Sequence, residues 1–243
     1  MGTIIGKIKN RFFKKLHISY SRWKVSYRYD KNSFNLKSTS NIFVDIYNNN
    51  LWDSQESKSG FGSTLDGTCT IREQLPILIA KYKIKTLLDV PCGDYNWMKE
   101  VKKDCSYIGG DIVEEVIHRN QQLYSTEKIQ FKHIDITKDP LQKVDLIFCK
   151  DCLQHLSHEK IVEALTNFVK SGSKYLLVTS YPLTWRNHDI YDGDYRPLNL
   201  LIKPYYLTNY ILKIKEQSKL NFIEADKTMY LFDLKSLKKF TVQ

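Results

Sequence analysis

The feature that most constrains the fold is an apolar strand that ends in a tight loop, followed by a second strand that ends in an acid. Residues 86–90 are apolar enough for a strand buried on both faces, and Pro91 and Gly93 end it. The second strand ends at Asp111. In open parallel sheets, ligands bind beyond the carboxyl ends of the strands. The sequence therefore predicts a nucleotide-type site, with Asp111 at the ribose hydroxyls.

The loop between these strands distinguishes two classes of cofactor. A nicotinamide site needs the pattern Gly-x-Gly-x-x-Gly so that a pyrophosphate can approach the backbone, but Gly93 stands alone. Asp89 at the strand end and Asp94 after the glycine would repel a pyrophosphate. The same acids suit a cationic sulfonium that carries an amino group. The loop therefore favours S-adenosylmethionine.

Four segments, taken together and in this order, resemble a known family. They are residues 88–98, 107–112, 145–157 and 193–200. They resemble a bacterial branch of the class I S-adenosylmethionine-dependent methyltransferases, whose members are often found among genes for capsular polysaccharide or other surface glycans. The resemblance covers residues 60–235. It departs from the wider class at the first loop, which is Gly-rich there and contains Pro91 here.

Alternating strand-like and helix-like segments predict an α/β fold. We expect strands at 85–90, 106–111, 129–134, 144–149 and 174–180, and helices at 69–82, 94–103, 113–124 and 158–171. Strand-like runs at 210–216 and 229–234 have no obvious helix between them and predict a C-terminal antiparallel hairpin. The expected fold is a doubly wound, Rossmann-like, mostly parallel seven-stranded sheet, with an N-terminal extension.

The N-terminal part differs from the rest in charge. Residues 1–29 hold eight basic side chains and no acid, although the whole chain has a net charge of only +10. The nearly neutral remainder argues against nucleic acid as a partner. Apolar residues at every fourth position of the segment predict an amphipathic helix. That helix would lie on an anionic membrane surface, dock a partner protein or cover its own domain.

Composition also suggests a domain boundary and a compartment. Residues 31–70 are rich in Asn, Ser and Thr and predict linker or loops, so we expect an extension over 1–59 and a catalytic domain over 60–243. No stretch of 18 apolar residues and no secretory signal is visible, which favours the cytoplasm, with peripheral contact at the inner membrane face as an option. The five cysteines are expected to be reduced thiols.

Methyl transfer to oxygen needs a group that removes the hydroxyl proton. His155, after the fourth expected strand, is the first choice for this base, and Asp151 is the alternative or its orienting partner. The competing interpretation is that His155 only caps or packs the next helix. Cys149, Cys152, His155 and His158 are spaced like zinc ligands, but a strand and the loop after it would not converge on one ion, so no metal is expected.

The expected cofactor site lies at the carboxyl ends of the first four expected strands. Asp135 is placed to meet the adenine amino group and Ile136 to pack on the ring. Structural roles compete for some of these residues, because Asp94 could cap a helix and Trp97 could belong to the core. The candidate cofactor residues are Asp89, Pro91, Cys92, Gly93, Asp94, Trp97, Asp111, Ile112, Asp135, Ile136 and Lys150.

Residues 181–200 combine aromatic rings with planar hydrogen-bonding side chains. Such a mixture suits a sugar, and an arginine can bind a phosphate through two parallel hydrogen bonds. A polar surface loop is the competing interpretation. The candidate substrate residues are Tyr181, Trp185, Arg186, Asn187, Asp194 and Arg196.

These observations predict an O-methyltransferase that modifies a sugar, nucleotide-activated and for example a heptose, in bacterial capsular polysaccharide biosynthesis. The sugar and the capsule follow from the resemblance. Alternatives are another capsule group such as a phosphoramidate, an RNA substrate, or a scaffold that has lost catalysis. The oligomeric state stays open, with a homodimer as one option.

Overall fold

The computed structural model describes residues 37–216 and 226–237. The amphipathic helix expected within residues 1–29 lies outside them. The described part forms a seven-stranded sheet in the order β3-β2-β1-β4-β5-β7-β6, in which β7 alone runs antiparallel to both of its neighbours. The strands are β1 (Thr86–Asp89), β2 (Ser106–Asp111), β3 (Ile129–His133), β4 (Leu146–Cys149), β5 (Tyr175–Ser180), β6 (Tyr210–Lys215) and β7 (Thr228–Asp233).

The fold class and the C-terminal hairpin expected from the sequence are confirmed. Because β1 pairs with both β2 and β4, the carboxyl ends of these three strands meet at one edge of the sheet. The four residues of β4 are fully buried, as their apolar run requires. This edge brings together the two motifs that carried the sequence argument.

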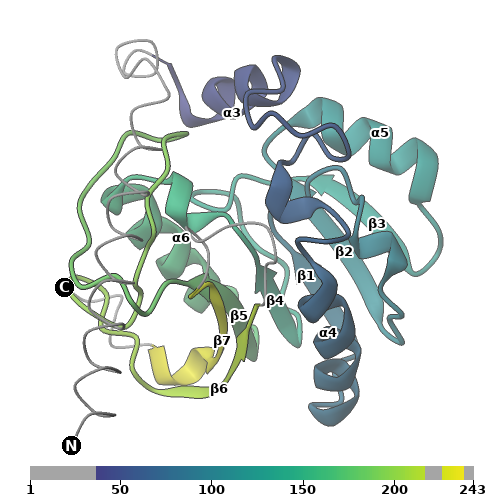
Figure 1. Ribbon diagram of the computed structural model, residues 1–243. Helices are drawn as coiled ribbons and strands as arrows, with labels where there is room; N and C mark the ends of the chain where they lie inside the picture. The colour runs from purple at the N-terminus through teal and green to yellow at the C-terminus, as the bar shows by residue number, and fades with distance from the viewer. Residues whose placement is uncertain (1–36, 217–225, 238–243) are drawn as a thin grey trace, which may run out of the picture.

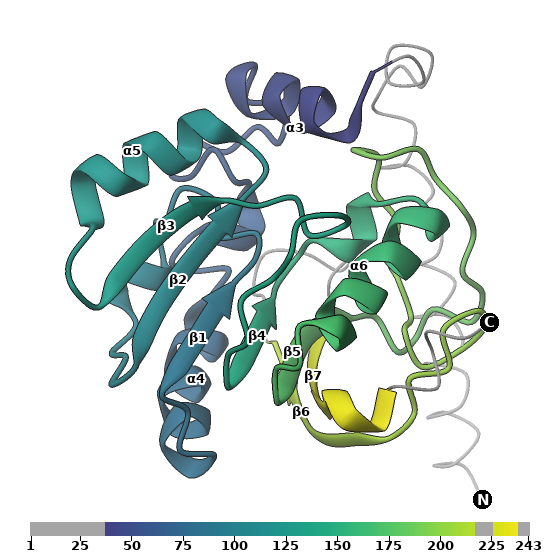
Figure 2. The ribbon, with the colours of Figure 1, turned by 180° about the vertical axis from the view of Figure 1, so that it is seen from behind.

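Helices cover both faces of the sheet. Figures 1 and 2, which view the molecule from opposite sides, show α4 (Cys69–Lys81) and α6 (His158–Lys170) on opposite faces. One core cluster joins α4 to Ile117 of α5 (Glu114–Tyr124), and the other is built around Phe168 of α6. Pro76 lies inside α4, which agrees with the helix expected over 69–82. None of the described helices combines the length and apolarity needed to cross a membrane.

A helix that the sequence did not predict lies across the top of the sheet in Figure 1. Residues 31–70 were expected to be loops, but α3 runs from Thr39 to Asn48. The Ser38 hydroxyl caps it by accepting a hydrogen bond from the Asn41 amide. Ile42 and Ile46, one turn apart, are buried beneath it, so the helix is held in place by its apolar face.

The helix expected over 94–103 is absent, and only a 3-10 turn forms at Met98–Glu100. Gly93 and Tyr95 adopt positive φ angles of 54° and 58°. A right-handed helix cannot pass through such residues, because the left-handed region opposes its hydrogen-bond pattern. The chain after β1 is therefore a structured loop.

Candidate active site

A cleft lies at the carboxyl ends of the first four strands, beneath α3. The space within it, counted out to its open mouth, is about 1030 Å³. Twelve of the residues expected from the sequence line it: Asp89, Pro91, Cys92, Gly93, Trp97, Asp111, Ile112, Asp135, Ile136, Lys150, Asp151 and His155. The structure therefore brings most of the predicted cofactor and catalytic residues into one cavity.

The loop after β1 is held by both backbone groups of Gly93. Its amide donates to Asp111 Oδ2 at 3.0 Å, and its carbonyl accepts from the Asn120 side chain at 2.7 Å. Asp111 Oδ1 also accepts from the Val113 amide at 3.0 Å. Each carboxylate oxygen can accept more than one hydrogen bond. Asp111 therefore keeps capacity for the two hydroxyls of a ribose.

Two buried carboxyl groups give the cleft affinity for a cation. Burial raises the pKa of Asp89 to about 7, although a hydrogen bond from the Tyr107 hydroxyl at 2.6 Å acts to lower it. Burial likewise raises the pKa of Asp111 to about 6. A positive ligand would favour the ionised forms of both groups. The donor set thus fits S-adenosylmethionine, whose sulfonium and ammonium groups are cationic.

Asp94 does not line the cleft. Its carboxylate accepts from the Ser57 hydroxyl at 2.9 Å and from the Lys58 amide at 3.1 Å. Its own amide donates to the Ser59 hydroxyl at 3.0 Å. The expectation that Asp94 offers charge to the cofactor is therefore corrected: its oxygens hold the segment before α4 against the loop.

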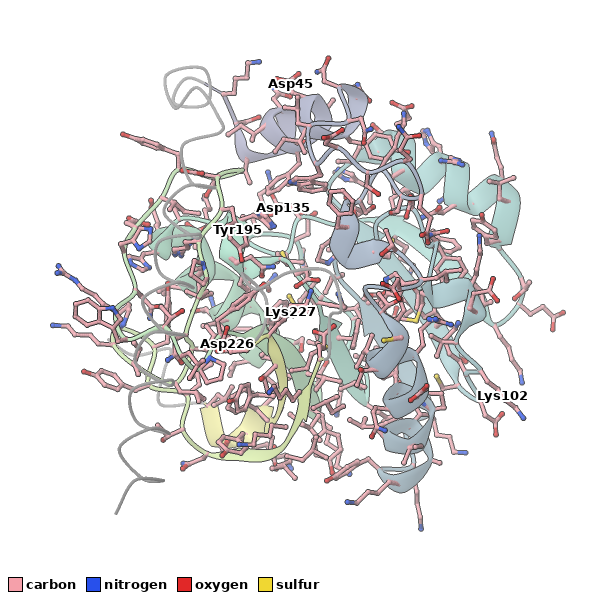
Figure 3. All side chains as sticks on the ribbon, in the orientation of Figure 1. Asp45, Lys102, Asp135, Tyr195, Asp226 and Lys227 are labelled. Carbon is pink, nitrogen blue, oxygen red and sulfur yellow. The ribbon has the colours of Figure 1, made fainter. Side chains whose placement is uncertain are left out.

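Asp135 lies below α3 in Figure 3, after β3, and lines the cleft. One carboxylate oxygen accepts from the amide and the hydroxyl of Thr137, at 2.9 and 2.6 Å. Burial alone would raise the pKa of Asp135, but these hydrogen bonds and nearby Lys138 outweigh it and lower the pKa. Asp135 is therefore an ionised acceptor, consistent with a contact to an adenine amino group.

His155 lies in the same cleft, in a 3-10 turn after β4. Its Nδ1 atom is 3.0 Å from the backbone oxygen of Asp194. Because a carbonyl only accepts, Nδ1 must carry the proton, and Nε2 is left as the acceptor of the neutral ring. Burial lowers the pKa of His155 below its ordinary 6.5, which keeps the ring neutral near pH 7. The ring can therefore take a proton from a hydroxyl.

Asp151 is unsuited to the alternative role of base. Its carboxylate accepts from Lys150, from Lys227 at 2.7 Å and from the Gln154 amide at 3.1 Å. Although burial acts to raise its pKa, the two lysines hold that pKa far below the usual range. A carboxylate with so low a pKa is a poor proton acceptor. Nor does it orient His155, since the Asp194 carbonyl does so.

The six candidate substrate residues do not line the cleft. The Arg196 side chain is fully buried and donates to the backbone oxygens of Gln154 and Leu156. Asn187 donates to the backbone of Asn199, and the Trp185 side chain is 81% exposed. These polar groups mostly bond to backbone within and beside their own loop. Tyr181, Trp185, Arg186, Asn187, Asp194 and Arg196 thus lie outside the lining of this cleft, and their role in substrate binding stays a prediction.

Sequence reasoning missed a group of cleft residues from the segment before α4. A hydroxyl cap at Ser38 followed by apolar residues at helical spacing was the signal that could have revealed α3. The residues missed are Thr39, Phe43, Tyr47, Trp52, Ser59 and Ser63. They form the roof of the cleft, opposite the strand ends.

The four residues spaced like zinc ligands do not converge. Cys149 is fully buried within β4, whereas His158 Nδ1 lies against the Tyr205 hydroxyl at 2.5 Å. Among residues 37–216 and 226–237, no three His, Cys, Asp or Glu side chains gather as a metal site.

Comparison with known proteins agrees with this site. Residues 87–172 match the family described as "Methyltransferase domain". No curated protein matches the chain. The match to the family spans the first four strands of the sheet and α6, and so includes His155 and the strand-end acids.

Several solved structures share the fold. Human N-acetylserotonin methyltransferase with bound S-adenosylmethionine has a TM-score of 0.58 at 16% identity, covering 91% of this chain, which spans 66% of that protein. The N-methyltransferase NodS from Bradyrhizobium japonicum, with S-adenosyl-L-homocysteine, gives 0.55 at 17% identity over 77% of this chain and 97% of that one. Magnesium protoporphyrin IX methyltransferase from Synechocystis, with S-adenosylmethionine, has a TM-score of 0.56 at 13% identity, and the match covers 81% of this chain and 97% of that protein. At these identities the likeness shows the fold.

Proposed function

We propose that this chain, an S-adenosylmethionine-dependent methyltransferase, transfers the methyl group to a hydroxyl of a sugar. The observation that carries the proposal is the state of His155. His155 lines the cavity that also holds Asp89 and Asp111, and with Nδ1 bonded to the Asp194 carbonyl its neutral ring keeps Nε2 as the proton acceptor. A base so placed suits an oxygen acceptor, because a hydroxyl must lose its proton as it is methylated.

The strand-end residues would bind the cofactor, and His155 would accept the proton. S-adenosylmethionine, when bound, supplies an electrophilic methyl group. Asp111 and Ile112 would hold its ribose, Asp135 and Ile136 its adenine, and Asp89 its charged end. As the acceptor oxygen forms its bond to carbon and the carbon–sulfur bond breaks, His155 Nε2 takes the hydroxyl proton. The Asp194 carbonyl stabilises the imidazolium that results.

A sugar is supported by the roof of the cleft. Trp52 beside His155 and Phe43 next to Trp52 offer aromatic surface, and Ser59 and Ser63 offer hydroxyls. Such a mixture suits a ring with apolar C–H faces and polar edges. The narrower assignment rests on the resemblance described above: a nucleotide-activated sugar such as a heptose, methylated in the cytoplasm for a capsular polysaccharide.

The proposal is tested by incubating the protein with methyl-labelled S-adenosylmethionine and a panel of nucleotide-linked sugars, the corresponding free sugars and RNA. We expect label in a nucleotide-linked sugar, with turnover that changes little with salt. Label in RNA, with binding that weakens steeply as salt rises, would overturn the proposal in favour of an RNA substrate. Label in no sugar would also overturn it.

A further inference from the structure

The segment before α4 places one aromatic side chain beside the base. The Trp52 ring lies 5.6 Å from the His155 ring, centroid to centroid, at an interplanar angle of 45°. Trp52 is half-buried and lines the cleft, so part of its indole faces the cavity. Trp52 lies outside residues 87–172, the range that matches the family. Trp52 is therefore a feature of this chain's own N-terminal segment.

The indole is held from two sides. Phe43 of α3 packs against it at 6.4 Å, and Trp52 joins the apolar cluster of Ile42 and Ile46. Gly60 lies behind it with φ of 88°, where a Cβ atom would come within 3.1 Å of Trp52 Cβ. Gly60 thus leaves room for the tryptophan side chain. A ring fixed in this way presents a preorganised flat surface at low entropic cost.

The indole N–H gives a second reason to expect a ligand. It is shielded from solvent and has no hydrogen-bond acceptor within residues 37–216 and 226–237. Buried donors without an acceptor are uncommon in folded proteins. An oxygen-rich ligand, together with a small shift of the ring, would satisfy this donor.

The charged groups beneath the base offer little to attract an anion. Asp151 pairs with Lys150 and Lys227, and Lys150 also lies 3.6 Å from Glu216. The two cations and two carboxylates cancel, and each lysine already faces a carboxylate. Arg196, the other cation that acts on His155, is buried outside the cleft lining and donates to the backbone oxygens of Gln154 and Leu156. An acceptor group next to His155 therefore gains little from carrying a negative charge there.

From this arrangement we propose that Trp52 selects the acceptor by stacking on the C–H face of a neutral, hydroxylated ring whose hydroxyl meets His155. The inference rests on the proposed function and names its substrate class: the ring that receives the methyl group is uncharged, and any phosphate of a nucleotide carrier lies away from this wall. Trp52 is then a specificity-determining residue.

The test compares Trp52→Leu and Trp52→Phe with wild type, using the nucleotide-linked sugars of the panel. Tyr206→Leu is the control, because the exposed Tyr206 lies outside the cleft. Loss of stacking should raise KM for the sugar roughly tenfold in Trp52→Leu, and Trp52→Phe should restore most of it. The Kd for S-adenosylmethionine, measured by calorimetry, should stay within about twofold of wild type in all variants.

The outcomes separate the two claims. If wild type methylates a sugar and Trp52→Leu has the same KM for it, the inference is wrong and the proposed function stands. If wild type methylates no sugar, both fail. Should Trp52→Leu not fold, wild type alone decides: we expect a free hexose to be preferred roughly tenfold over its 6-phosphate, and the reverse preference would overturn the inference.

Discussion

His155 and Asp194 are joined through the backbone, since His155 Nδ1 lies 3.0 Å from the Asp194 carbonyl oxygen. The adjacent Gly193 amide donates in return to the His155 carbonyl at 2.7 Å. The proposed base is therefore oriented by main-chain atoms of a distant loop. Asp192 fastens that loop, because its carboxylate accepts from the Thr39 hydroxyl at 2.6 Å and from the Ser157 amide at 2.8 Å.

Asp111→Asn should weaken cofactor binding. The substitution removes the charge that would accept the ribose hydroxyls, so we expect the Kd for S-adenosylmethionine to rise roughly tenfold or more by calorimetry. Because the pKa of Asp111 is raised to about 6, the wild-type protein should lose affinity as pH falls through that value, while the variant changes less. The exposed Asp104→Asn is the control. Equal Kd values for variant and wild type would contradict the assignment of Asp111.

Gly93→Ala should loosen the cofactor loop for two reasons. Gly93 has φ of 54°, and a Cβ atom would lie 2.4 Å from Ser59 Oγ. Strain of about 1–2 kcal/mol therefore adds to a steric clash. Adding Ser59→Gly removes the clash but not the strain, so the double variant should recover part of the cofactor affinity.

Gly172→Ala provides the matched control for this pair. Gly172 has φ of 68°, and its nearest contact is Lys143 Cδ at 3.9 Å. It therefore carries the strain without a clash, far from the cleft in sequence and outside its lining. Its variant should lose some stability and keep its Kd for S-adenosylmethionine. If Gly93→Ala and Gly172→Ala have the same Kd for S-adenosylmethionine, the contact between residue 93 and Ser59 does not affect cofactor binding.

Asp151→Asn should destabilise the fold rather than remove a base. It leaves the buried Lys150 and Lys227 without their shared counter-ion, and breaking a buried pair costs about 3–5 kcal/mol of unfolding free energy. Since the lysines depress the pKa of Asp151 below its ordinary 3.8, its stabilisation is complete above that pH and is lost as pH falls further. Denaturant titration measures both effects, with exposed Asp66→Asn as control. Unchanged stability would contradict this role.

Local patterns predicted the sheet well. The alternation of strand-like and helix-like segments identified β2 with its observed bounds, and the acids at strand ends led to the cofactor side of the cleft. The same reasoning failed where main-chain geometry decides. Positive φ at Tyr95 replaced a helix with a loop, and the partner of His155 is a carbonyl, which no residue type reveals.

The roof and the acceptor side were harder to predict, because they depend on long-range packing. Polar composition hid α3, whose apolar residues find their partners far along the chain: a Cβ at Gly193 would lie 2.3 Å from Ile42 Cγ2. The aromatic loop at 181–200 suggested a sugar site, yet several of its polar side chains bond to backbone within the loop or beside it. The division between an extension over 1–59 and a catalytic domain over 60–243 stays a prediction, although residues 57–59 bond to the cofactor loop.

The most direct measurement of the central claim is turnover of the methylated sugar against pH at saturating cofactor, for wild type and His155→Gln. We predict a loss of roughly 10²–10⁴-fold in kcat for the variant, since a general base contributes about that much. Wild type should lose activity as pH falls below 6.5, because protonation of His155 removes the base, and the variant should lack this dependence. Exposed His118→Gln is the control. A His155→Gln enzyme with wild-type kcat and the same pH profile would contradict the account.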